Sequence, residues 1–257
     1  MLQPYGIAIA PDRKIYVADT FGKAIHVFDL DRSRYSTVRV EGESLIGVAF
    51  AAGCLFVTDS VSGRVLSVDT KGHKIWTLGR KEGFERPAGL ATAGDRLYVV
   101  DTMRNRVVIT SLAGAIIGSF GERGGQPGQF NFPTNIARAS DGRLYVTDTM
   151  NFRVQIFDAE GRYLRAFGRL GDGSGDFDKP KGIAVDSGGH IYVVEGFNDV
   201  VQIFDEAGRL MLVFGESGFG FGQFWLPTGI TIANDLIYVA DSANRRVQIF
   251  EYLKDGR

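Results

Sequence analysis

Six consecutive sequence units of 40 to 47 residues predict an all-β fold, a six-bladed β-propeller of four-stranded antiparallel blades. Two independent series of residues repeat at this spacing. The first opens a short apolar run in each unit: Gly6, Gly47, Gly89, Asn135, Gly182 and Gly229. The second is acidic and closes the next apolar run: Asp19, Asp59, Asp101, Asp148, Glu195 and Asp241. The expected blades of this single domain are 4–43, 44–86, 87–132, 133–179, 180–226 and 227–257.

The fourth unit illustrates how each blade is divided into strands. Short runs rich in Val, Ile, Phe and Tyr predict strands a to d, counted from the propeller axis outward, at 135–139, 144–147, 153–157 and 163–167. Gly-containing turns separate several of these runs, such as Asp141-Gly142 and Glu160-Gly161. No window shows a sustained 3.6-residue apolar period, which leaves little room for helix.

The sixth unit contains runs for strands a, b and c and then reaches the turn Asp255-Gly256-Arg257. The equivalent turns in units four and five are each followed by a strand d. Because unpaired edges promote aggregation, we expect the natural chain to extend upstream of Met1 and to supply the missing strand. Such an upstream segment could also carry an export signal or lipid anchor, so the sequence leaves the cellular compartment open. The alternative is a three-stranded last blade.

The residue pattern of the repeat resembles the consensus of the NHL-repeat family. Residues 145–158 (YVTDTMNFRVQIFD) and 238–251 (YVADSANRRVQIFE) are similar to its strand b, polar loop and strand c. Phe-x-x-Pro follows a Gly-rich loop in several units and ends at Pro87, Pro133, Pro180 and Pro227. The resemblance covers essentially the whole chain. It implies a domain that commonly mediates protein contacts; some animal members bind RNA, and prokaryotic look-alikes are often exported proteins.

Charge, hydrophobic stretches and cysteine content exclude several classes of function and structure. The formal net charge is −1, from 29 basic and 30 acidic residues. Nucleic-acid binding is therefore not expected, because phosphate contacts require a clear basic excess. The longest uncharged stretch, 107–120, is too short for a membrane span. Cys54 is the single cysteine, so no intrachain disulfide forms. We expect a monomer.

The acidic series carries an arginine five residues later in four units: Arg64, Arg106, Arg153 and Arg246. A repeated ion pair is expected to be structural, because catalytic sites are seldom sixfold. Units one and five depart from it, with Ala24 and Val200 in place of arginine. Asp19 and Glu195 therefore lack the usual partner. They are candidates for a cation or basic-ligand site, and drift of a degenerate repeat is the alternative.

The loops between strands b and c, and between strand d and the next strand a, are expected on one face of a propeller, where partners commonly bind. Apolar residues at the loop tips predict a binding surface of the kind that exposed patches mark. The candidate binding residues are Phe21, Met103, Arg104, Met150, Phe152, Phe197, Asn198, Trp225 and Arg245. The alternative is that these apolar side chains fold down between the blades.

Similarity to six-bladed enzymes suggests a possible metal. A three-histidine zinc site, as in the amidating lyases of the group, is not expected, since His26 falls in a strand c and His73 and His190 in turns on the opposite face. The calcium-binding lactonases suggest Asn135, together with Asp19 and Glu195, as candidate Ca²⁺ ligands. No cofactor is otherwise expected.

No nucleophile–base motif is present, so no catalytic residue is assigned. The leading hypothesis is a non-catalytic scaffold that binds a protein or small-molecule ligand on the face of the d–a and b–c loops. The alternative is a divalent-cation-dependent hydrolase or lyase with its site at the mouth of the central channel.

Overall fold

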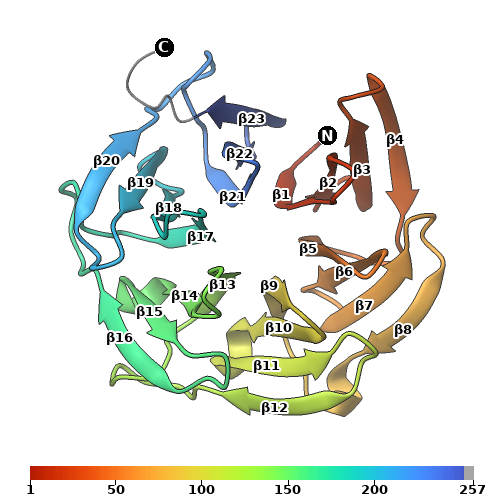
Figure 1. The fold of residues 1–257 in the computed structure, drawn as a ribbon, viewed down its shortest axis with the longest axis horizontal. Helices are drawn as coiled ribbons and strands as arrows, with labels where there is room; N and C mark the ends of the chain where they lie inside the picture. The colour runs from red at the N-terminus through yellow and green to blue at the C-terminus, as the bar shows by residue number, and fades with distance from the viewer. Residues whose placement is uncertain (252–257) are drawn as a thin grey trace.

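A computed structural model describes residues 1–251, and the expected turn at 255–257 lies outside the described residues. Six antiparallel sheets stand around a central axis, and within each sheet the strand order follows the chain (Figure 1). Five sheets have four strands, and the last has three within the described residues. The predicted six-bladed β-propeller is therefore confirmed.

The strands occupy equivalent positions in every blade. Strand a lies nearest the axis: β1 (Pro4–Ile9), β5 (Leu45–Ala51), β9 (Pro87–Ala93), β13 (Pro133–Arg138), β17 (Pro180–Val185) and β21 (Pro227–Ala233). Strand b is β2 (Lys14–Asp19), β6 (Cys54–Asp59), β10 (Arg96–Asp101), β14 (Leu144–Asp148), β18 (Ile191–Glu195) and β22 (Leu236–Asp241).

Strand c is β3 (Ala24–Asp29), β7 (Arg64–Asp69), β11 (Arg106–Ser111), β15 (Arg153–Phe157), β19 (Val200–Phe204) and β23 (Arg246–Glu251). Strand d forms the outer edge: β4 (Arg34–Arg39), β8 (Lys74–Leu78), β12 (Ile116–Phe120), β16 (Tyr163–Phe167) and β20 (Leu210–Phe214). Three single-turn 3₁₀ helices lie in the loops: η1 (Arg80–Glu82), η2 (Thr102–Arg104) and η3 (Thr149–Asn151). Among the residues described, no helix is long and apolar enough to cross a membrane.

The apolar core lies between neighbouring blades. Tyr98 and Val107 of blade three, for example, pack in one buried cluster with Leu144 and Phe157 of blade four. The Phe of each Phe-x-x-Pro motif is a wedge in this core: Phe84, Phe130, Phe177 and Phe224 are all essentially inaccessible. Burying a whole phenylalanine side chain stabilises a fold by about 1.5–3 kcal/mol. The motif therefore fixes each linker against two blades just before the next strand a begins.

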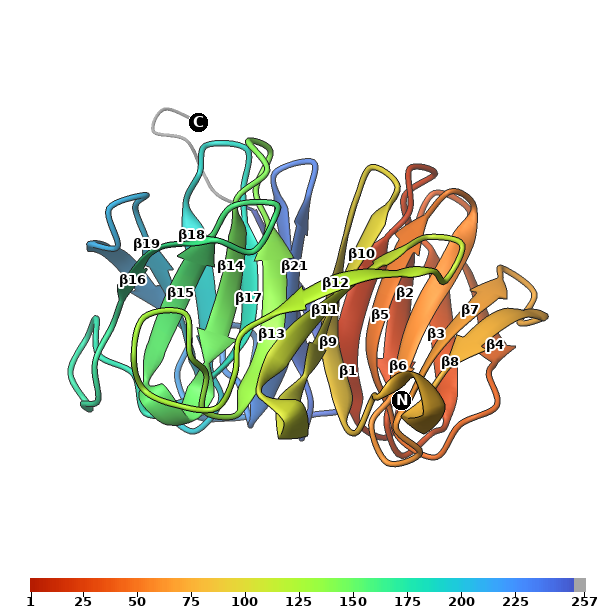
Figure 2. The same cartoon turned by 90° about the horizontal axis from the view of Figure 1, so that it is seen from below.

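The ring closes between β21 and β1, as the views in Figures 1 and 2 agree. Ser242 Oγ donates a hydrogen bond to the carbonyl oxygen of Pro4 across this junction at 2.5 Å. Gly229 lies so close to blade one that an added Cβ would stand 2.0 Å from the carbonyl oxygen of Tyr5. The glycine series thus marks the places where each inner strand meets the next blade.

Candidate functional site

The d–a and b–c loops lie along one rim of the propeller, the lower one in Figure 2. The apolar loop-tip residues on this rim point into solvent, with exposed fractions of 42% to 69%: Phe21, Val61, Met103, Met150, Phe197 and Trp225. We refer to this rim as the loop face. Exposed large apolar side chains of this kind are typical of surfaces that bind a partner.

The remaining candidates on the loop face differ in their exposure. Asn198 and Arg245 are exposed, and Arg104 forms an ion pair with Glu85 at 2.9 Å. Phe152 is partly buried, because its ring packs against the core between blades four and five. Of the two orientations left open by the sequence, Phe152 thus takes the inward one.

Two phenylalanines that the sequence analysis did not select also lie on this face. Phe219 and Phe221 are in the linker between blades five and six, and Phe221 is 100% exposed. The Phe219 ring meets the Trp225 indole edge to face, with 5.1 Å between centroids. Comparison of the linkers could have identified Phe219 from the sequence. The two preceding linkers have Gly125 and Asp172 at the equivalent position, so an aromatic residue there is specific to this linker.

The acidic series has a structural role that explains its repetition. All six carboxylates are fully buried at the end of strand b. Each accepts hydrogen bonds from main-chain N–H groups of the linker that leads into its own blade, as Asp148 does from Asn131 at 2.7 Å and Asp241 from Trp225 at 2.8 Å. The carboxylate thus joins the d–a linker to the b–c loop in every blade.

Arginine completes this connection where it is present. Arg153 donates from Nε to Asp148 at 2.8 Å and from its terminal nitrogen to the carbonyl oxygens of Gln126 and Gln129. Arg246 does the same for Asp241 at 2.7 Å in blade six. These contacts agree with the structural role expected for the pairs.

In blade one, where Ala24 stands at the arginine position, the buried acid is contacted by a histidine of strand c. His26 Nε2 lies 2.9 Å from Asp19 Oδ2, and its Nδ1 lies 2.6 Å from the Tyr35 hydroxyl. Burial opposes ionisation of Asp19, but hydrogen bonds from Gln3, Leu2, Gly22 and His26 outweigh it and hold the pKa of this carboxyl below its usual range. Asp19 therefore has a partner, although not the one that the repeat uses elsewhere.

Blade five has no such replacement. Glu195 Oε2 accepts two long hydrogen bonds, from the N–H groups of Asp178 and Lys179 at 3.2 Å each. Its Oε1 is buried and has no hydrogen-bond partner among the described residues. Burial raises the pKa of Glu195 to about 7, because those two bonds only partly compensate for desolvation.

Two lysines surround the loop tip of the same blade. The ammonium nitrogens of Lys179 and Lys181 lie 4.5 Å and 5.5 Å from the ring centroid of Phe197, which is 52% exposed. Neither lysine forms a salt bridge within residues 1–251. Burial lowers the pKa of Lys181 against the attraction of Asp199 and Glu195. Blade five thus combines two lysines that form no salt bridge within residues 1–251, an exposed ring and a buried acid.

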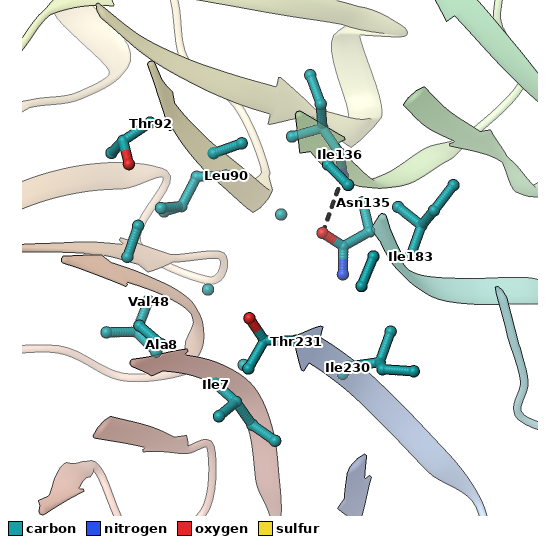
Figure 3. Close-up of a pocket in the computed structure, with 18 of the residues that line it drawn as sticks. Ile7, Ala8, Val48, Leu90, Thr92, Asn135, Ile136, Ile183, Ile230 and Thr231 are labelled. Carbon is teal, nitrogen blue, oxygen red and sulfur yellow. Dashed lines mark hydrogen bonds between the residues drawn. The ribbon is translucent and has the colours of Figure 1, made fainter. Parts of the chain in front are cut away.

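The central channel, unlike the loop face of blade five, is lined mainly by apolar side chains. A cavity of about 250 Å³ follows the inner strands and is lined mainly by aliphatic side chains such as Ile7, Val48 and Ile230 (Figure 3). Asn135 is one of the few polar groups there, and its Oδ1 already accepts a hydrogen bond from the N–H of Ile136 at 2.8 Å.

These residues do not fit a calcium ion, which takes six to eight oxygen ligands. Asp19 and Glu195 belong to blades one and five, and their carboxylate oxygens accept hydrogen bonds from the linkers of their own blades. The exception is Glu195 Oε1, which has no hydrogen-bond partner among the described residues. Within residues 1–251 no group of three His, Cys, Asp or Glu side chains is placed to hold a metal. His73 and His190 lie in the turns after β7 and β17, away from His26 in β3, as the sequence predicted.

The chain matches two sequence-family models, and its structure is similar to those of several solved propeller proteins. Residues 134–202 match the family model described as 6-bladed beta-propeller, and residues 224–250 match the NHL repeat. A virginiamycin B lyase from Staphylococcus aureus is 15% identical with a TM-score of 0.70, over 99% of this chain and 86% of the lyase chain. A gluconolactonase from Xanthomonas campestris is 17% identical with a TM-score of 0.72, over 94% and 84% of the two chains.

A chain of a nidogen–laminin complex is 17% identical with a TM-score of 0.70, over 93% of this chain and 86% of its own length. At such identities these structures share the fold alone, and the fold serves enzymes and protein complexes alike. The chain is a six-bladed β-propeller that carries an NHL repeat.

Proposed function

We propose that this protein is a non-catalytic scaffold that binds a protein segment on its loop face. The observation that carries the proposal is the set of apolar tips, Phe21, Val61, Met103, Met150, Phe197 and Trp225, which stand in solvent on one rim. A ring of Met and aromatic side chains suits an adaptable protein interface.

Charge favours a partner segment that carries acidic residues. Arg86, Lys179, Lys181 and Arg245 stand on or beside the strand a starts and b–c loops, and none of them forms a salt bridge within the described residues. Opposite charge on the partner would direct its approach and fix its register on the apolar tips. The neighbour in the nidogen–laminin complex supports protein binding only as an analogy of fold.

Selection of displayed peptides on the immobilised protein tests this function. Peptides with both apolar and acidic residues should be enriched and should bind with a measurable Kd. A variant with Phe21, Met103 and Met150 changed to Ser should lose at least about tenfold in affinity, because a few large contact residues carry most of the binding energy of an interface and tenfold corresponds to only about 1.4 kcal/mol.

The matched control changes exposed apolar residues on the outer strands, Ile75, Ile117 and Met211, to Ser. These side chains are exposed to a similar degree, but they lie on the strand d elements β8, β12 and β20 at the outer edge of the propeller and not on the loop face. The control should keep wild-type affinity. Failure to enrich any peptide, or equal losses in the two variants, would overturn the scaffold function.

A further inference from the structure

Blade five departs from the other blades at positions that meet in space. The second residue of strand a is Tyr5, Ile46, Ala88, Thr134, Lys181 or Thr228, and the residue after the buried acid is Thr20, Ser60, Thr102, Thr149, Gly196 or Ser242. In blade four the two hydroxyls at these positions, Thr134 and Thr149, are 2.7 Å apart, and in blade six Thr228 and Ser242 are 2.6 Å apart.

In blade five the same pair is a lysine and a glycine. An added Cβ on Gly196 would stand 2.8 Å from Cδ and Cε of Lys181 and 2.9 Å from its Nζ. The missing side chain at Gly196 thus makes the space through which the Lys181 side chain passes to reach Phe197. The two departures are complementary, so drift at a single position does not account for them.

The result is a clamp made of Lys179, Lys181, Gly196 and Phe197. Both ammonium groups lie against the exposed Phe197 ring, and neither forms a salt bridge within residues 1–251, although Asp199 and Glu195 attract Lys181 from beyond salt-bridge distance. Bringing two like charges together costs energy unless an anion is present. The buried acids close by, Glu195 and Asp199, use their oxygens on their own loop and linker, except for Glu195 Oε1.

We propose that this clamp binds a carboxylate whose carrier packs an apolar group on the Phe197 ring. The inference rests on the proposed function, since it names the acidic group that the loop face would recognise in a docked segment. A monovalent carboxylate suits the site better than a phosphate, because Asp199 and Asp178 beside the lysines would repel a second negative charge. Charge-assisted hydrogen bonds from both ammonium groups would hold the carboxylate oxygens.

Titration with small probes followed by NMR and calorimetry tests the clamp directly. Benzoate should bind and shift the side-chain signals of Lys179, Lys181 and Phe197, whereas its neutral isostere benzamide should not. Lys181→Thr, which installs the residue of blades four and six, and Lys179→Ala should each weaken benzoate binding by about tenfold or more, the loss expected for one charge-assisted hydrogen bond.

Lys23→Thr, which removes an exposed cation from the loop face of blade one, is the matched control and should leave benzoate binding unchanged. A capped peptide with an internal glutamate beside a phenylalanine should compete with benzoate if the carboxylate comes from a protein. A free carboxylate metabolite as the source would instead give benzoate binding with no competition by the peptide.

The outcomes separate the two proposals. Benzoate binding by the wild-type protein, when selection on that protein enriches no peptide, would support the clamp and reject the scaffold. Equal binding of benzamide and benzoate, tighter binding of inorganic phosphate, or unchanged benzoate binding by well-folded Lys181→Thr and Lys179→Ala proteins would overturn the clamp.

Discussion

Arg153 donates a hydrogen bond from Nε to Oδ2 of Asp148 at 2.8 Å, and both groups are shielded from solvent. The same guanidinium bonds to two linker carbonyls, so a single side chain connects strand b, strand c and the incoming linker. This connection is the part of the repeat that stabilises the loop face. Its presence in blade four and its absence in blade five allow its contribution to be measured within one molecule.

Replacing Arg153 with Leu should lower the free energy of unfolding by about 3 kcal/mol, because Asp148 would keep a buried charge without its cation. The measurement is urea denaturation at neutral pH. Arg209→Leu is the control: its guanidinium is 82% exposed beside Asp205, and loss of such a surface pair should cost about 0–1 kcal/mol. Equal effects of the two substitutions would contradict the structural role assigned to the buried pair.

Restoring the pair in blade five should stabilise the protein. Glu195→Asp and Val200→Arg together recreate the residues of blades four and six. A double-mutant cycle should show favourable coupling of about 0.5–3 kcal/mol, the range found for contacting residues in one network. Simple additivity of the two changes would mean that the linker of blade five no longer offers the guanidinium its acceptors.

His26 should be replaceable by glutamine but not by leucine. Strand c of blades four, five and six places Gln155, Gln202 and Gln248 at the equivalent position, and Gln155 Nε2 donates to Asp148 at 2.9 Å. His26→Gln should therefore change the free energy of unfolding little. His26→Leu removes a hydrogen-bond partner from the buried Asp19 and should cost about 1–3 kcal/mol. Thermal unfolding of the two variants, compared at one pH, would show whether Asp19 depends on this partner.

Much of the architecture could be predicted from the sequence, because each blade repeats the same physical requirements. A glycine is needed in five of the six places where inner strands meet, an acid where the linker N–H groups converge in every blade, and a buried Phe before strand a in blades three to six. The inward orientation of Phe152 could not be predicted, because the same loop position has a left-handed backbone in every blade and yet Lys23 and Arg245 are exposed there.

The clamp in blade five escaped prediction for another reason. Lys181 and Gly196 are each unremarkable residues, and they lie on different elements fifteen positions apart. Only the pairing of β17 with β18 brings the start of strand a against the b–c loop, with Pro180 opposite Glu195. Comparison of the six units position by position would have flagged both residues, but their contact is a property of the folded blade.

The pH dependence of stability should report on Glu195. Its pKa is about 7 in the folded protein against an ordinary value of 4.5, so the folded state binds this proton more tightly than the unfolded state. The stabilisation is fully present below pH 4.5 and is lost as the pH rises through 7. Its size is on the order of 3 kcal/mol, from about 1.4 kcal/mol for each pH unit between the two values.

Glu195→Gln isolates this contribution, because glutamine keeps the shape and cannot ionise. Lys181, Asp178 and Asp199 face the same group in both proteins, so their effects largely cancel in the difference. The free energy of unfolding of the wild type, relative to the variant, should fall between pH 4.5 and pH 8 in urea titrations. A difference that stays constant, or that rises with pH, would show that Glu195 is ionised throughout and that Lys181 or solvent supplies the missing counter-charge.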